Sequence, residues 1–220
     1  DDANISTALE AAWPALGIDS IWLAEQEKQR AVDAITNYAV WDAKESATFA
    51  TAGLEVGVDH IFTVDDLADF GITTEDIASV DATTVPVRVK GRIDRLERTD
   101  AGQYVIVDFK TGKTVPSKED TQDNAQLALY QLALSGSDKD TTPVVKAKLV
   151  YLRPRSGSLG ERDQQALDAD ERKRWRLALQ TAASATSGPT FHACRNDHCT
   201  QCVVQESCPL YSHSILARKA

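Results

Sequence analysis

Two strand-like stretches joined by a very short loop constrain the fold of this chain more than any other feature. Val85 to Glu97 and Tyr104 to Lys110 are rich in β-branched and aromatic residues, which favour strands. Between them lies Asp100-Ala101-Gly102, and a three-residue loop with glycine near the left-handed position is a common hairpin connection. If Ala101 centres the turn, Leu96 lies opposite Ile106. The sequence therefore predicts an antiparallel hairpin with a defined register.

Helical and strand-like segments occur on both sides of this hairpin. Residues 65–84 are acidic and rich in turn-forming residues, and residues 153–165, rich in Arg, Gly and Ser, are expected to form a loop. Trp13, Trp22 and Trp41 are expected to be buried. The periodicity of the apolar residues predicts helices over residues 5–17, 20–42, 119–135 and 168–184, and further strands over residues 54–64 and 144–152.

This order of elements predicts a mixed α/β domain with a central β-sheet flanked by helices. The 220 residues are enough for one large domain with its own hydrophobic core. We divide the chain into a helical and acidic N-terminal part (1–84), a core that contains the hairpin (85–187) and a cysteine-rich tail (188–220).

Charge is distributed unevenly along the chain. The whole sequence has a net charge of −9, but residues 1–90 hold 17 acidic and 5 basic residues, whereas residues 91–220 hold 16 and 19. A polyanion would therefore bind in the second part, where arginines and lysines concentrate between residues 153 and 176. The alternative is that both charged regions are solvated surfaces, or that the acidic part docks a basic partner. No apolar run approaches the roughly 20 residues that a membrane span needs.

The hairpin carries three charged residues that can form a catalytic centre. Asp108 and Lys110 are two residues apart and so share one face of a strand, while Val107 and Phe109 point to the opposite face, into the core. In the register given above, Asp94 lies directly across from Asp108. Two carboxylates that close repel each other unless a divalent cation, such as Mg²⁺ or Mn²⁺, binds between them.

A metal ion, two carboxylates and a lysine suffice for hydrolysis of a phosphodiester bond. The metal lowers the pKa of a bound water and offsets the charge that develops on the phosphate, while the lysine contacts a phosphate oxygen or orients the water. The alternative is a surface hairpin whose charges interact only with solvent and neighbouring residues, as is common on edge strands.

All four cysteines of the chain fall within 15 residues: Cys194, Cys199, Cys202 and Cys208. A disulfide framework would usually spread its cysteines over the whole fold. Clustered thiols around a Cys-x2-Cys core are typical of metal ligation in a reducing compartment, and either Zn²⁺ or an iron–sulfur cluster suits four thiolates. The cysteines therefore predict a structural metal centre that fixes the C-terminal segment.

Three sequence blocks resemble the PD-(D/E)xK nuclease superfamily, and most closely its RecB-like nuclease domain. They occur in the family's order: Gly91 to Arg95, Val107 to Gly112, and Gln126 to Tyr130, the last similar to the family's Gln-x3-Tyr motif. The cysteine tail resembles that of the iron–sulfur nuclease domains of AddB and AdnB. The nearest fit is the C-terminal nuclease domain of an actinobacterial UvrD-like helicase–nuclease.

The resemblance implies a restriction-endonuclease-like fold and a DNA nuclease that requires Mg²⁺ or Mn²⁺. It further implies exonuclease action in DNA end processing and recombinational repair, a helicase domain or subunit as partner, and a cytoplasmic location. The four cysteines would hold a [4Fe–4S] cluster, with Zn²⁺ as the alternative.

The resemblance also implies a role for each residue of the site. Asp94 and Asp108 would be metal ligands, together with the backbone carbonyl of Phe109. Lys110 would be the catalytic lysine. Gln126 and Tyr130 would hold the DNA or the site itself.

Two departures from the family pattern matter. The family's Gly-Thr-x-x-His block, whose histidine completes the metal site, is absent, and His60 is the only histidine before the hairpin. Cys194 lies close to the other cysteines, whereas the first cysteine of the family usually lies far upstream. The chain also lacks Met, which leads us to expect a fragment of a longer protein. The alternative function is therefore a catalytically inactive nuclease-like domain that binds DNA or a partner.

Overall fold

The computed structural model describes residues 2–16, 21–136, 142–156, 159–188 and 193–211. Its elements, in chain order, are α1 (Asp2–Ala12), η1 (Trp13–Leu16), α2 (Ile21–Glu45), β1 (Ala50–Phe62), η2 (Asp65–Phe70), α3 (Thr74–Ser79), β2 (Val87–Arg98), β3 (Tyr104–Lys110), α4 (Lys118–Gln122), α5 (Ala125–Ser135), β4 (Val144–Tyr151), β5 (Gly160–Gln165), α6 (Ala169–Ser187), η3 (Asp197–Gln201) and η4 (Gln205–Ser207), where η denotes a 3₁₀ helix.

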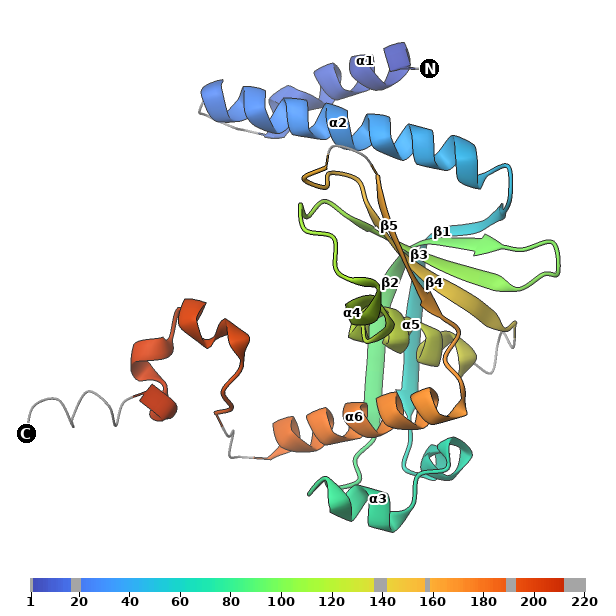
Figure 1. Ribbon diagram of the computed structural model, residues 1–220, viewed down its shortest axis with the longest axis vertical. Coiled ribbons are helices and arrows are strands. Elements are labelled where there is room, and N and C mark those ends of the chain that lie inside the picture. The colour runs from blue at the N-terminus through green and yellow to red at the C-terminus, as the bar shows by residue number, and fades with distance from the viewer. Residues whose placement is uncertain (1, 17–20, 137–141, 157–158, 189–192, 212–220) are drawn as a thin grey trace, which may run out of the picture.

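The five strands form one mixed sheet in the order β1-β2-β3-β4-β5 (Figure 1). Neighbouring strands are antiparallel except β3 and β4, which are parallel. Parallel neighbours need a crossover connection, and the segment with α4 and α5 provides it. Helix α6 lies on the same side of the sheet as α5, whereas α2 lies on the opposite side (Figure 1). This arrangement confirms the predicted mixed sheet flanked by helices.

The hairpin of β2 and β3 has the predicted register. Leu96 pairs with Ile106, and the neighbouring pairs, Arg95 with Val107 and Glu97 with Val105, follow the same register. The turn is closed by hydrogen bonds from the Thr99 amide to the Gln103 carbonyl (2.9 Å) and from the Gly102 amide to the Thr99 carbonyl (2.8 Å). Gly102 has a φ of 79°, a conformation that glycine adopts without steric cost. The turn residues therefore determine which side chains of the two strands face each other.

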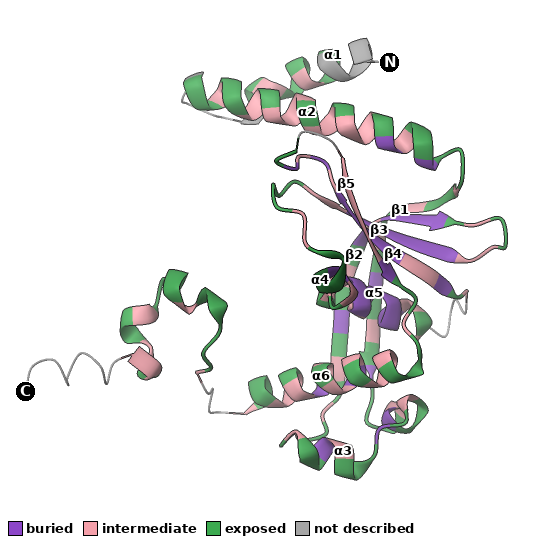
Figure 2. Ribbon diagram, viewed as in Figure 1, coloured by how far each residue is buried: buried purple, intermediate pink, exposed green. Residues whose placement is uncertain are grey.

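Alternate side chains of β3 enter two separate hydrophobic cores. Tyr104 and Ile106 face α5 and pack in the larger core, which β1, β2 and β4 also line. Val105 and Val107 point the other way and pack with Trp41 of α2, whose side chain is fully buried. Figure 2 shows the buried residues concentrated in the sheet and in α5. Because side chains alternate along a strand, each core takes every second residue.

Two buried polar side chains attach helix α6 to the segments that follow β1 and precede β2. Arg176 donates a hydrogen bond to the carbonyl of Thr63 at 3.0 Å. Gln180 donates to the carbonyls of Thr83 (2.8 Å) and Val85 (3.1 Å). These bonds satisfy carbonyl groups in the segments that flank η2 and α3. The region of η2 and α3 also has a small apolar core of its own, which packs beside α6.

Two buried cations of the sheet form ion pairs with acidic side chains near the end of α2. Lys148 of β4 lies 2.5 Å from a carboxylate oxygen of Glu45, at the end of α2. Arg95 of β2 pairs with Asp42 of α2 and with Glu97, 3.1 Å away. Burial raises the pKa of Glu97, and the charge of Glu45 raises it further, against the opposing charge of Arg95. Since charges this deep in the fold are tolerated only in pairs, they fix the position of α2 on the sheet.

The segment over residues 119–135 forms two helices, so the prediction of a single helix is wrong there. Helix α4 ends at Gln122, and α5 begins after Asn124, whose side chain accepts a hydrogen bond from the Leu127 amide at 3.0 Å. Asparagine competes for helical hydrogen bonds through its own side chain and is a preferred first-turn cap. The Asp123-Asn124 pair therefore divides the helix.

The segment over residues 153–165 contains the edge strand β5, so the prediction of a loop is wrong for its second half. Strand β5 pairs antiparallel with β4, for example through Gln164 and Ala147. Its sequence from Gly160 to Gln165 has no apolar residue, and so it lacks the alternation that identifies strands in a sequence. Pairing with the neighbouring strand, rather than local propensity, makes this segment extended.

The three N-terminal tryptophans differ in burial. Trp41 is fully buried and Trp13 is half-buried, but Trp22 is 70% exposed, so the prediction that all three are buried is wrong for Trp22. Trp22 lies in the first part of α2, which runs beside α1 and away from the sheet (Figure 1). Within the described ranges, no helix has both the length and the apolarity needed to cross a membrane.

Replacing Lys148 by methionine leaves Glu45 buried without its partner. We expect Lys148→Met to lower the free energy of unfolding by about 3–5 kcal/mol, as measured by urea denaturation. The double variant Lys148→Met with Glu45→Leu removes both charges and should recover most of that loss. Lys146 is the matched control, because it lies on the same strand and pairs with Asp163 in a more exposed position. Lys146→Met should change stability by at most about 1 kcal/mol, and an equal effect of both lysines would contradict this account.

Candidate active site

The five side chains that the sequence singled out lie together on the α5 side of the sheet. Asp94 comes from β2, Asp108 and Lys110 come from β3, and Gln126 and Tyr130 come from α5. The even-numbered residues of β3 face α5, and a spacing of four places Gln126 and Tyr130 on one side of their helix. The hairpin register and the crossover helix thus bring distant parts of the chain into one site.

Lys110 is oriented by two acceptors. Its ammonium nitrogen Nζ lies 2.6 Å from Oδ2 of Asp108 and donates a hydrogen bond of 2.6 Å to Oε1 of Gln126. The lysine side chain remains 31% exposed, whereas that of Asp108 is only 4% exposed. The ammonium group is therefore held in one place and is still accessible from solvent.

Gln126 links the other members of the site. Its amide oxygen accepts the bond from Lys110, and its amide nitrogen Nε2 donates to Oδ1 of Asp108 at 2.7 Å and to the hydroxyl of Tyr130 at 3.2 Å. One amide group thus contacts both ends of the Asp108–Lys110 ion pair. Since an amide offers both a donor and an acceptor, glutamine suits this bridging position.

Tyr130 connects the site to the backbone of β2. Its hydroxyl donates a hydrogen bond of 2.7 Å to the carbonyl of Arg92. The ring passes directly over Gly91, where a β-carbon would lie 2.8 Å from Cε1 of Tyr130. A side chain at position 91 would therefore displace the ring, and this explains why a glycine begins the first of the three sequence blocks.

Gln164 of β5 positions the start of α5, a role that no sequence pattern indicated. Its side chain is fully buried and donates to the carbonyls of Thr121 (3.3 Å), Gln122 (2.9 Å) and Asn124 (3.0 Å). These three carbonyls belong to the break between α4 and α5, one turn before Gln126. Because β5 carries no apolar pattern, only its pairing in the sheet reveals the function of Gln164.

Asp94 lies where β2 and β3 separate. The last residues that pair across the hairpin are Arg95 and Val107, one step before Asp94 and Asp108. Beyond them, the amide of Phe109 donates to Oδ2 of Asp94 at 2.7 Å instead of to the backbone of β2. The carboxylate of Asp94 thus accepts the hydrogen bond in place of a backbone carbonyl of β2, and this bond fixes it beside Phe109.

Burial raises the pKa of Asp108 above the usual range of aspartate. The hydrogen bond and charge of Lys110 oppose this effect, and the negative charge of Asp94 adds to it. The negative charge of Asp94 thus disfavours the ionised form of Asp108, although the two residues do not form the directly opposed pair of the ladder that the sequence predicted. Oδ2 of Asp108 is also buried without a hydrogen bond of normal geometry, although Lys110 lies nearby.

These groups suit a hard divalent cation that keeps several waters. Asp94, Asp108 and the carbonyl of Phe109 are oxygen donors, which Mg²⁺ and Mn²⁺ prefer, and Oδ2 of Asp108, which contacts Lys110 at 2.6 Å, is a natural ligand atom. A cation between the carboxylates would remove their repulsion. Among the residues that the structure describes, no group of three His, Cys, Asp or Glu side chains could hold a metal. The described residues would therefore contribute the two carboxylates and the carbonyl of Phe109.

Glu55 and His60, both on β1, do not complete this site. Glu55 forms an exposed ion pair with Arg92 at 3.2 Å. His60 packs edge-on against Phe62, with ring centroids 4.4 Å apart, and beside Gly136 just past the end of α5. Gln126 lies at the opposite end of that helix, so His60 is distant from the two carboxylates.

The four cysteines lie in the segment with η3 and η4, which is separate from the sheet (Figure 1). Cys194 and Cys202 are exposed, and Cys199 and Cys208 are half-buried. The thiol of Cys199 accepts a hydrogen bond from the Asn196 amide at 3.2 Å. Within the described part of the chain these thiols are not grouped closely enough to form a metal site, so ligation stays a prediction.

Comparison with known proteins gives one informative match. The sequence pattern of the PD-(D/E)XK nuclease superfamily matches residues 1–209. No curated protein matches the chain. A solved structure named "Crystal structure of SSO0001" is 19% identical, with 93% of this chain and 80% of that chain covered and a TM-score of 0.45.

The family match covers the sheet, both helical layers and the site. The five-stranded mixed sheet flanked by helices is consistent with the restriction-endonuclease-like α/β fold that the resemblance implied. The matched range also contains the pair of carboxylates and the lysine on adjacent strands. The chain therefore belongs to the PD-(D/E)XK nuclease superfamily.

Proposed function

We propose that this chain is a metal-dependent DNA nuclease domain whose active centre consists of Asp94, Asp108 and Lys110. The observation that carries this proposal is the contact of Lys110 with both Asp108 and Gln126, next to the carboxylate of Asp94. A surface hairpin would leave these charges in solvent. Here Asp108 is buried, and burial raises its pKa because it disfavours the ionised carboxylate. A raised pKa of this kind is a common sign of a functional carboxylate.

Each residue has a role that its contacts support. Asp94, Asp108 and the carbonyl of Phe109 would hold Mg²⁺ or Mn²⁺, which when bound supplies a more acidic water and offsets negative charge on the phosphate. Lys110 presents its ammonium group to a phosphate oxygen or to the attacking water. Gln126 keeps that ammonium group in place, and Tyr130 keeps Gln126 in place. The last two are positioning residues in this account.

The finer assignment rests on the resemblance described above. We infer exonuclease action in DNA end processing and recombinational repair, with a helicase domain or subunit as partner. The same resemblance supports a cytoplasmic protein and a three-part chain with divisions near residues 84 and 187. The acidic N-terminal part suits contact with a basic partner surface.

A catalytically inactive domain that binds DNA or a partner is the second candidate. The observation in its favour is that the described residues offer no third acidic or histidine side chain to the carboxylate pair. The two candidates differ in whether loss of Lys110 changes the rate of cleavage.

Lys110→Ala should reduce cleavage of labelled single-stranded DNA in Mn²⁺ by at least about a hundredfold, because it removes a charge aimed at the reacting phosphate. The assay is gel analysis of a 5′-labelled oligonucleotide. Lys90→Ala is the matched control, since Lys90 is an exposed lysine on β2. Its rate should stay within a factor of two or so of the parent, as for most surface substitutions. Equal rates for the parent and Lys110→Ala would favour the inactive domain.

Asp108→Asn should stabilise the protein at neutral pH while abolishing cleavage. The raised pKa means that the folded state retains the Asp108 proton to a higher pH than the unfolded chain does. Ionisation of Asp108 therefore destabilises the fold as pH rises, and the gain from asparagine should be largest near pH 7.5 and small near pH 4. Thermal unfolding at the two pH values measures it.

The same samples test metal binding without any activity. Mn²⁺ should raise the unfolding temperature of the parent, because a ligand that binds only the folded state stabilises it. It should not raise that of Asp108→Asn. A shift of equal size in both proteins would mean that the ion binds elsewhere.

The cysteine tail should contain iron and sulfide when the protein is purified without oxygen. We infer that Cys194, Cys199, Cys202 and Cys208 bind a [4Fe–4S] cluster, with Zn²⁺ as the alternative metal. Metal analysis and the visible absorption spectrum decide between them. Zinc at one ion per chain with no visible absorption would contradict the cluster, and absence of both metals would contradict ligation altogether.

A further inference from the structure

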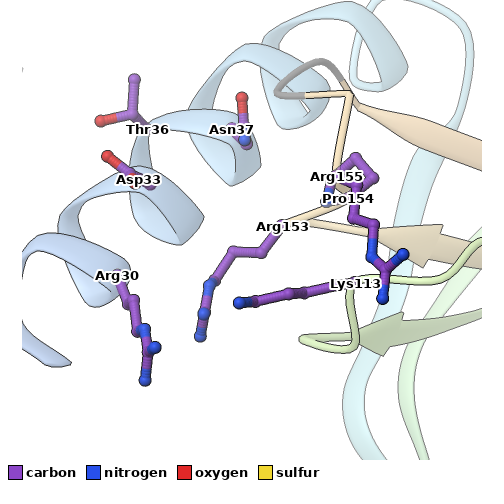
Figure 3. Close-up of a pocket in the computed structure, with 8 residues that line it drawn as sticks. All are labelled: Arg30, Asp33, Thr36, Asn37, Lys113, Arg153, Pro154 and Arg155. Carbon is purple, nitrogen blue, oxygen red and sulfur yellow. The ribbon is translucent and has the colours of Figure 1, made fainter. Parts of the chain in front are cut away.

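A cavity of about 560 Å³ opens between α2 and the loops that follow β3 and β4. Figure 3 shows four cationic side chains that extend into it from three separate parts of the chain. They are Arg30 from α2, Lys113 from the loop after β3, and Arg153 and Arg155 from the loop after β4. The other lining residues are Asp33, Thr36, Asn37 and Pro154.

Three of these cations are not neutralised by the protein. Arg30 forms an ion pair with Glu27 on its own helix. Within the described part of the chain, no carboxylate lies within 4 Å of the charged groups of Lys113, Arg153 or Arg155. The lining thus carries four cations and one carboxylate, that of Asp33, so its net charge is positive and favours an anion in the cavity.

Backbone hydrogen bonds fix the loops that carry these cations. The Arg155 amide donates to the carbonyl of Lys113 at 3.0 Å, which joins the two loops. The side chain of Asn37 donates to the carbonyl of Leu152 at 2.7 Å, which joins the second loop to α2. The Leu152 amide donates to the carbonyl of Lys110 at 2.9 Å. The cations are therefore held near one another by the fold.

A second cavity of about 400 Å³ adjoins the first and shares Lys113, Pro154 and Arg155 with it. It adds Arg162 of β5, whose side chain donates to the carbonyl of Pro116 at 2.8 Å. We call these two neighbouring cavities together the basic groove, defined by Arg30, Lys113, Arg153, Arg155 and Arg162.

The basic groove lies at the end of β3 that carries Lys110. Lys113 follows Lys110 by three residues, and three extended residues span at most roughly 11 Å. The hydrogen bond between Leu152 and Lys110 places Arg153 equally near the end of β3. A strand whose phosphate contacts Lys110 could thus continue into the groove.

We propose that the basic groove binds phosphate groups of a nucleic-acid strand adjacent to the bond that is cut. This inference rests on the proposed nuclease function for the placement of the strand, but not for the binding itself. Among the described residues that line the groove, none has an aromatic side chain on which a base could stack, and the apolar ones are Pro154, Val115 and Leu159. A ligand held mainly by charge, without an aromatic surface for a base, is a nucleic-acid backbone rather than a small nucleotide.

The structure separates this groove from the other basic residues of the chain. On α6, Lys173 pairs with Asp76 at 2.9 Å and Arg174 pairs with Asp123 at 2.7 Å. The guanidinium group of Arg172 lies over the ring of Phe70. These three cations are already engaged, so they supply a control with the same change of net charge.

The test measures binding of fluorescent single-stranded DNA by anisotropy in EDTA, where no cleavage occurs. The groove variant Lys113→Ala, Arg153→Ala and Arg155→Ala should bind at least tenfold more weakly than the parent. The slope of log K against log salt should fall by roughly two, at about 0.7 per lost phosphate contact. The control variant Arg172→Ala, Lys173→Ala and Arg174→Ala should bind within about threefold of the parent. Thermal unfolding confirms that both are folded.

Oligonucleotides with a 5′-phosphate or a 5′-hydroxyl distinguish terminal from internal phosphates. If the parent prefers the 5′-phosphate and the groove variant does not, the groove holds the terminal phosphate. If the two oligonucleotides bind alike and the groove variant weakens both, it holds internal phosphates. Unchanged binding by the groove variant, or an equal loss in the control variant, would overturn the proposal.

Failure of this proposal can be told apart from failure of the nuclease assignment. Lys110→Ala should lose cleavage and keep its affinity for DNA in EDTA. The groove variant should lose affinity for DNA in EDTA, whether or not the parent cleaves DNA. If the parent does not cleave DNA but the groove variant still binds DNA more weakly than the parent, the result would support the groove and reject the nuclease.

Discussion

In the β2–β3 hairpin, Leu96 pairs with Ile106, and the positions of most other important side chains depend on this register. A shift by one residue would exchange the two faces of β3. Val105 and Val107 would then turn away from Trp41, and Asp108 would enter the apolar core beneath α2. The turn at Gly102 thus sets both the packing of the two helical layers and the location of the carboxylates.

The fold places charges on both faces of its sheet, and they have different consequences. Beneath α2, Glu45 and Lys148 neutralise each other and fasten the helix. On the α5 side, Asp108 is buried next to a second carboxylate and has an oxygen without a hydrogen bond of normal geometry. The first arrangement stabilises the protein as long as both partners remain. The second lowers stability but provides a group that a cation can bind, as is usual in active sites.

The unequal distribution of charge along the chain is partly reversed in space. Residues 1–90 are strongly acidic, yet Arg30 from this part faces three cations from the second part. Conversely, several of the basic residues between 153 and 176 are engaged within the fold, because Arg176 is buried and Arg174 is paired. A count of charges therefore indicated one half of the chain for a polyanion, but not the surface that we propose for it.

The sequence by itself determined the hairpin, its register and the placement of Asp108 and Lys110 on one face of a strand, because turn geometry and the alternation of strand residues are local properties. It also indicated the helix that carries Gln126 and Tyr130, through their spacing. Only the tertiary structure decided the strand β5, the break before α5 and the role of Gln164, since these depend on hydrogen bonds between segments some 40 residues apart. The basic groove was likewise hidden, because its cations come from α2, from the loops after β3 and β4 and from β5, which approach each other only in the folded protein.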